Sequence, residues 1–130
     1  MKIATATDDG KTISRHFGRA AYYLVLTVEN DRIVRHEKRD KPGHDEFSKR
    51  EPGRRKASHG QGREARSHHA EMIAAIRDCQ VVLSRGMGWG AYERLKAYDI
   101  TPIITEIADI EGAVRAYLDG TIIDHRERLH

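Results

Sequence analysis

The chain has 130 residues and a mass of 14.8 kDa, which is the size of one domain with one hydrophobic core. Hydrophobic residues make up only 38% and charged residues 33%, so part of the chain must lie mostly at the surface. No apolar stretch approaches the roughly 20 residues of a membrane helix, and no signal peptide follows Met1, so we expect a cytoplasmic protein without a membrane partner. The single cysteine, Cys79, excludes an internal disulfide and a cluster site made of four cysteines from this chain.

Three strands are predicted in the first part of the chain. Residues 2–7 are small and apolar and end at the turn signal Asp8-Asp9-Gly10, which is typical of a central strand covered on both faces. Residues 22–28 form a Tyr/Leu/Val run, and a more polar strand begins at 32–36 after the Glu29-Asn30-Asp31 turn. The last two strands should form a hairpin whose polar member lies at the edge of a sheet.

The remainder of the chain alternates helix and strand. Helices are expected at 67–78, capped by Ser67, at about 90–98, and at 109–120, where Gly120 ends the pattern. Apolar strands are expected at 81–84 and 100–105.

This order of elements predicts an α/β fold: a three-layer sandwich around a five-stranded mixed sheet with strand order 3-2-1-4-5. Residues 1–120 form one α/β domain, and residues 121–130 are expected to be a polar C-terminal tail. If strands 2–7 and 81–84 are parallel neighbours, the crevice beyond their carboxyl ends is the topological switch point, where open α/β sheets bind ligands. The loops that follow these two strands should meet there.

A glycine-rich loop follows the strand at 81–84 and opens the next helix. Its residues Ser84, Arg85, Gly86, Gly88 and Gly90 allow close backbone approach, and its free N–H groups suit an anion. The same glycine spacing also serves tight strand-to-helix turns, and it matches neither a dinucleotide fingerprint nor a Walker loop.

A histidine lies in the long loop after the first strand. His16 stands between Arg15 and Arg19, so an imidazole that could bind a metal is flanked by side chains that attract anions, although a lone loop histidine is more often an ordinary surface residue. His68 and His69 are adjacent, so their side chains splay about 100° apart on a helix and offer at most auxiliary metal ligands.

Residues 41–66 form a basic insert with Phe47 as the only large apolar residue, and we expect it to be flexible. Two sharper readings are an arm that binds nucleic acid and a histidine-bearing flap over a metal site. The arginines lack interleaved aromatic residues, which weighs against nucleic acid.

Catalytic signals are weak. Asp8 and Asp9 end the first strand, where a nuclease of ribonuclease H topology keeps a carboxylate, but the end of the strand at 81–84 offers no acid, so two-metal hydrolysis lacks its ligands. No Gly-x-Ser-x-Gly elbow is present.

Four segments of the chain resemble one family. They are MKIATATDDG, ISRHFGRAAYYLV, SHHAEMIAAIRDCQVVLSRGMGWGAYERLKAYDITPI and AYLDG, and the pairing of HFGRA with GMGWGAYERL is the most specific part. The chain is similar to the dinitrogenase iron–molybdenum cofactor biosynthesis family, small proteins that carry or insert metalloclusters. The resemblance implies a ribonuclease H-like motif fold without nuclease activity, and a cluster-binding role for His16 facing Gly86, Gly88 and Gly90.

The leading hypothesis is therefore a non-enzymatic carrier of an anionic iron–sulfur metallocluster, like the iron–molybdenum cofactor or its precursor, with cluster donor and acceptor proteins as partners. His16 would bind the metal, with Arg15, Arg19 and the loop from Ser84 to Gly90 around the cluster. One alternative is a regulatory or interaction domain whose basic insert contacts nucleic acid or an acidic protein. Another is an enzyme that acts on a small phosphorylated substrate through the glycine loop.

Overall fold

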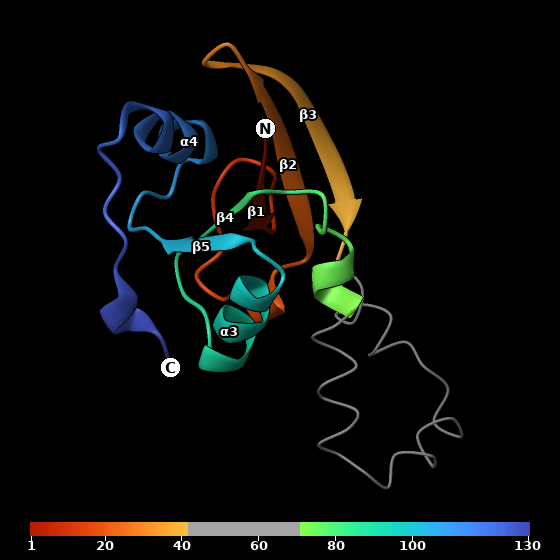
Figure 1. Ribbon diagram of the computed structural model, residues 1–130, viewed down its shortest axis with the longest axis vertical. Helices are drawn as coiled ribbons and strands as arrows, with labels where there is room; N and C mark the ends of the chain where they lie inside the picture. The colour runs from red at the N-terminus through yellow and green to blue at the C-terminus, as the bar shows by residue number, and fades with distance from the viewer. Residues whose placement is uncertain (42–70) are drawn as a thin grey trace, which may run out of the picture.

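Five strands form one mixed sheet in the order β3-β2-β1-β4-β5 in the computed structural model, which describes residues 1–41 and 71–130 (Figure 1). β1 pairs antiparallel with β2 and parallel with β4, as the partners Ile3 and Val81 show. The predicted α/β class and strand order are therefore confirmed. The strands are β1 Lys2–Thr7, β2 Tyr22–Glu29, β3 Arg32–Asp40, β4 Val81–Ser84 and β5 Thr101–Ile104.

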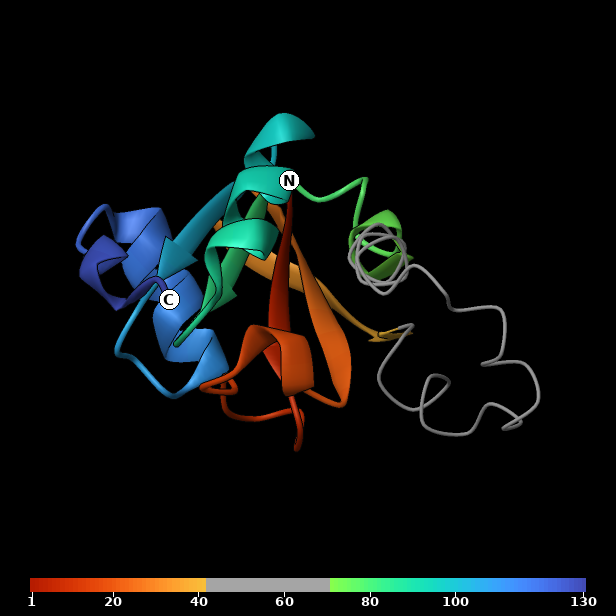
Figure 2. The same cartoon turned by 90° about the horizontal axis from the view of Figure 1, so that it is seen from below.

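Helical segments cover both faces of the sheet (Figure 2). Helix α3, Trp89–Ala97, and the segment at 71–78 pack on one face, and helix α4, Ile110–Asp119, packs on the other. Successive side chains of β1 point to opposite faces of the sheet, so the strand contributes to both cores: Ala4 and Ala6 face the α3 side, and Ile3 faces α4. No helix among the described residues is long and apolar enough to cross a membrane.

Local signals place most element ends. The Asp109 carboxylate accepts the Gly112 N–H at 2.6 Å and so caps α4, and Gly120 ends that helix in the left-handed region with φ 78°. Two expectations differ from the structure. The helix expected to reach Asp78 is helical at 71–74 and continues as turns, and the strand expected at 32–36 runs to Asp40 because β2 offers partners along its whole length.

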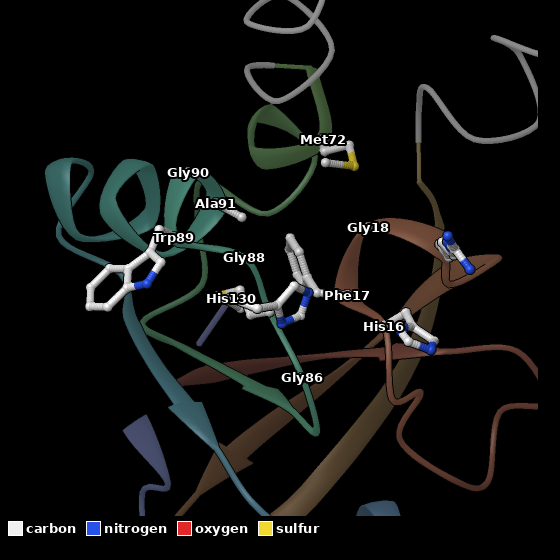
Figure 3. Close-up of a pocket in the computed structure, with 12 residues that line it drawn as sticks. His16, Phe17, Gly18, Met72, Gly86, Gly88, Trp89, Gly90, Ala91 and His130 are labelled. Atoms are coloured by element: carbon white, nitrogen blue, oxygen red, sulfur yellow. The ribbon is translucent and has the colours of Figure 1, made fainter. Parts of the chain in front are cut away.

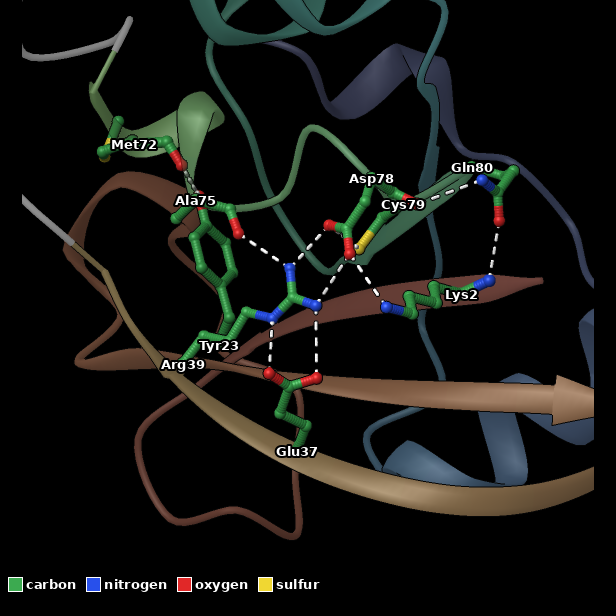
Figure 4. Close-up of polar contacts among 9 residues, drawn as sticks. All are labelled: Lys2, Tyr23, Glu37, Arg39, Met72, Ala75, Asp78, Cys79 and Gln80. Carbon is green, nitrogen blue, oxygen red and sulfur yellow. Dashed lines mark hydrogen bonds and ion pairs between the residues drawn. The ribbon is translucent and has the colours of Figure 1, made fainter.

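Arg39 joins the edge strand β3 to the segment at 71–78 (Figure 4). Its guanidinium donates to both carboxylate oxygens of Asp78, at 2.6 and 2.9 Å, and to the carbonyl oxygen of Ala75 at 2.9 Å. Lys2 donates to the same carboxylate at 2.9 Å, and Glu37 pairs with Arg39 from within β3. These hydrogen bonds, led by those from Arg39, hold the pKa of Asp78 well below its usual range.

The polar segment at 121–130 lies against the domain. The His125 N–H donates to the Ile104 carbonyl oxygen at 2.7 Å, and the Asp124 carboxylate accepts the Ile104 N–H at 3.0 Å. Leu129 pairs with Met87 as an isolated bridge and packs on the core. This segment was expected only to be a polar tail, and the edge of β5 provides the backbone partners that hold it in place.

Candidate functional site

A cavity of about 420 Å³ lies beyond the carboxyl ends of β1 and β4, where the switch point was predicted (Figure 3). The loop after β1 and the glycine-rich loop after β4 form its two sides, and the C-terminal segment contributes His130 to the lining. Its lining residues are His16, Phe17, Gly18, Arg19, Met72, Gly86, Met87, Gly88, Trp89, Gly90, Ala91 and His130.

Hydrogen bonds at the start of the first loop use the two carboxylates that follow β1. Asp9 accepts the N–H groups of Lys11 and Thr12 at 2.9 and 2.8 Å, and these bonds keep its pKa well below the usual range. Asp8 accepts the Ala21 N–H at 2.8 Å and so ties the two ends of the loop together. Both carboxylates therefore organise the loop.

The rest of this loop places His16 at the cavity. The Ser14 N–H donates to the Ala6 carbonyl oxygen at 2.8 Å, and the Ser14 hydroxyl accepts the His16 N–H at 3.1 Å. Phe17 is buried and starts the short 3-10 helix η1, Phe17–Arg19, so its ring anchors the loop in the core. The His16 side chain remains exposed at the cavity.

Direct backbone contacts join the two loops. The Phe17 N–H donates to the Gly86 carbonyl oxygen at 3.0 Å, and the Arg85 N–H donates to the Ser14 carbonyl oxygen at 3.3 Å. Position 86 requires glycine, because a Cβ there would overlap the carbonyl oxygen of Arg15. The HFGR and GMGWG segments can therefore lie against each other only because the backbones of Gly86 and Arg15 approach closely.

Several N–H groups of the glycine-rich loop are already used. The Gly86 N–H donates to the Ser84 hydroxyl at 3.1 Å, and the Trp89 N–H donates to the His130 carbonyl oxygen at 2.9 Å. Within the ranges 1–41 and 71–130, the N–H groups of Gly90 and Ala91 in the first turn of α3 have no acceptor. The free N–H groups expected in this loop are therefore found at Gly90 and Ala91, while those of Gly86 and Trp89 are used within the protein.

His130 completes the cavity from the C-terminal segment. Its backbone makes two hydrogen bonds to the glycine-rich loop: its N–H donates to the Met87 carbonyl oxygen at 3.2 Å, and its main-chain oxygen accepts the Trp89 N–H. Figure 3 shows the two histidines on different segments, with His130 beside Phe17 and the glycine-rich loop and His16 on the other side of Phe17. The indole of Trp89 is 54% exposed at the rim.

The structure brings together His16, Arg19 and the three glycines of the predicted site. Three other predicted residues lie outside the lining: Arg15 contributes a backbone contact, the Ser84 hydroxyl is buried in its own turn, and Arg85 is half-buried behind the loop. The auxiliary ligands His68 and His69, and residues 42–66 of the insert, lie outside the described residues.

The first residue of the predicted insert is buried in the fold. Lys41 was assigned to the flexible segment, but its side chain is 3% exposed and packs behind the cavity. Its ammonium group lies over the Phe17 ring and donates to the Met72 sulfur, and both residues are distant in sequence.

Cys79 is a core residue, as expected. Burial raises the pKa of its thiol to about 12, so the neutral form prevails and the sulfur is a poor metal ligand. Among the residues that the structure describes, no three His, Cys, Asp or Glu side chains converge on one point. A bare metal ion therefore lacks a complete set of protein ligands in the described part of the chain.

Seven lining residues were not among the predicted site residues: Phe17, Gly18, Met72, Met87, Trp89, Ala91 and His130. Met87 and Trp89 stand between the glycines of the loop, so their position could have indicated a lining role. Met72 and His130 carry no such signal, because only tertiary contacts bring them to the site.

The fold and this cavity define an α/β protein with a ligand pocket at the switch point of a mixed sheet. The family described as dinitrogenase iron-molybdenum cofactor matches residues 1–120, and the chain belongs to this family. The predicted family is thus confirmed. No curated protein matches the sequence.

Solved structures share the fold across nearly the whole chain. The apo form of the orange protein from Desulfovibrio gigas has a TM-score of 0.66 at 19% identity, covering 96% of this chain and 92% of that one. PH0822 has a TM-score of 0.69 at 19% identity and 98% coverage of both chains. A protein of Methanocaldococcus jannaschii, MJ0327, has a TM-score of 0.64 at 13% identity, covering 97% and 95%. At these identities the likeness concerns the fold alone.

Proposed function

We propose that this protein is a non-enzymatic carrier that holds an anionic iron–sulfur metallocluster, like the iron–molybdenum cofactor or its precursor, in the pocket between the two loops. The observation that carries the proposal is the juxtaposition of His16 with the glycine-rich loop in one cavity, in a chain of the iron-molybdenum cofactor family. Cluster donor and acceptor proteins would be its partners.

The ligand set supports a preformed cluster as cargo over a single metal ion. Among the described residues, the lining contributes two imidazoles and two thioethers but no carboxylate or thiol side chain, whereas a bare ion needs three or four protein ligands. A cluster brings its own sulfide ligands, so one exchangeable bond from His16 is enough to hold it and still permits release.

The remaining polar groups suit a negative charge. Arg19 lines the pocket, and the free N–H groups of Gly90 and Ala91 lie at the positive end of the α3 dipole. The described lining has no carboxylate, hydroxyl or thiol side chain, so a serine, cysteine or carboxylate nucleophile is absent from it.

Anaerobic reconstitution with iron and sulfide tests the proposal. The wild type should gain visible absorption and bound iron, and His16→Ala should bind the cluster at least about tenfold more weakly, since even indirect ligand contacts contribute on that order. His36→Ala is the matched control, because His36 is an exposed histidine on β3, paired with Glu111 at 3.1 Å. Equal loading of His16→Ala and wild type would refute the role of His16, and no loading of the wild type would refute the carrier function.

A further inference from the structure

Lys41 lies directly behind one wall of the pocket. Its Nζ atom donates to the Gly18 carbonyl oxygen at 3.1 Å and to the Met72 sulfur at 3.2 Å, and it lies 5.4 Å from the centre of the Phe17 ring. Gly18, Met72 and Phe17 all line the pocket. One layer of side chain and backbone therefore separates this amine from whatever occupies the cavity.

The positive charge of Lys41 is not compensated within the described residues. No carboxylate there forms an ion pair with it, and Asp8 attracts it only from beyond salt-bridge distance. The titratable or charged side chains next to it in the chain or on the neighbouring segments include three exposed groups, Arg19, Asp40 and Glu71. The buried phenol of Tyr23 has its ring centre 5.9 Å from Nζ.

An ammonium group buried without a counterion is costly. Burial accordingly lowers the pKa of Lys41 to about 8. Replacing such a residue by an apolar one of similar length would be neutral or stabilising for the fold alone. The stability of the fold therefore does not account for a lysine at this position, whereas binding of an anionic ligand would.

We propose that Lys41 supplies the countercharge for an anionic cargo held against Phe17, Gly18 and Met72. This inference rests on the carrier function proposed above and adds the residue that selects the charge of the cargo. The thioethers and apolar rings of the lining favour a polarisable, weakly hydrated cargo over a strongly hydrated one, and with the charge of Lys41 this suits a sulfur-rich metal cluster.

Binding of the anion should also be coupled to protonation of Lys41. A bound anion raises the pKa of Lys41, so loading above about pH 8 takes up a proton that the free protein has released. Affinity should therefore be independent of Lys41 ionisation below that pH and fall by about tenfold in total above it, because the neutral amine no longer supplies the charge.

Tetrathiomolybdate is a suitable probe, because it is a sulfur-rich dianion over the whole pH range used and absorbs visible light. Its affinity for the full chain is measured by anaerobic equilibrium dialysis for wild type, Lys41→Met and Lys38→Met. Lys38→Met is the matched control, since it removes the same charge from an exposed position on β3. We expect Lys41→Met to bind about tenfold more weakly and to lose the alkaline slope, and Lys38→Met to match wild type.

The outcomes separate the two proposals. If wild type and Lys41→Met bind with equal affinity and the same pH profile, the role of Lys41 is refuted and the carrier function stands. If wild type binds neither tetrathiomolybdate nor a reconstituted cluster, both are refuted. If Lys41→Met does not fold, NMR titration of the Lys41 Cε resonance in the wild type decides: a pKa raised by the probe supports the inference, and an unchanged pKa refutes it.

Discussion

Substituting Gly86 by alanine tests whether the close approach of the two loops builds the pocket. The new Cβ would overlap the Arg15 carbonyl oxygen, so the backbone must move, and the bonds from Phe17 to Gly86 and from Arg85 to Ser14 would lengthen or break. Forcing extra volume into a packed region costs about 1–3 kcal/mol, and each lost hydrogen bond costs about 0.5–1.5 kcal/mol. With two hydrogen bonds lost, the expected loss is therefore about 2–6 kcal/mol in the free energy of unfolding.

Urea denaturation followed by circular dichroism measures this loss, and a thermal scan should show Tm lower by about 8–24 °C. Gly18→Ala is the matched control, because Gly18 lines the same pocket and a Cβ there meets nothing within 4 Å. It should change stability by less than about 0.5 kcal/mol. The reasoning is refuted if Gly86→Ala is as stable as Gly18→Ala and loads the cluster equally well.

Two further predictions concern the contacts behind the pocket. The depressed pKa of Asp78 means that its ion pair with Arg39 stabilises the fold above about pH 4 and that this contribution is lost as the pH falls. Asp78→Asn should therefore flatten the acid side of the profile of unfolding free energy against pH, measured by urea denaturation. Asp31→Asn, in an exposed pair with Arg115, should leave this profile unchanged. Tyr23→Phe removes the hydroxyl that donates to the Met72 carbonyl oxygen at 3.0 Å, so it should cost about 1–3 kcal/mol, and an unaltered urea midpoint would contradict this.

Much of the scaffold could be predicted because its signals are local. The small residues of β1, the Asp109 cap and the Gly120 stop each act within a few residues, and with the rules for chain connections they determine the strand order. The same order places the loop of His16 beside the glycine-rich loop, so this part of the candidate site was accessible from the sequence.

Other parts of the site depend on contacts between residues that are far apart in the chain. Lys41 reads as the first residue of a charged insert, and only its contact with Met72 shows that it is buried. His130 reads as part of a polar tail, and only its backbone pairing with Met87 and Trp89 brings it to the pocket and occupies an N–H group that sequence reasoning left free. Periodicity and turn chemistry describe neighbours along the chain, whereas these contacts arise when the sheet and its covering segments pack, so the tertiary structure alone decided them.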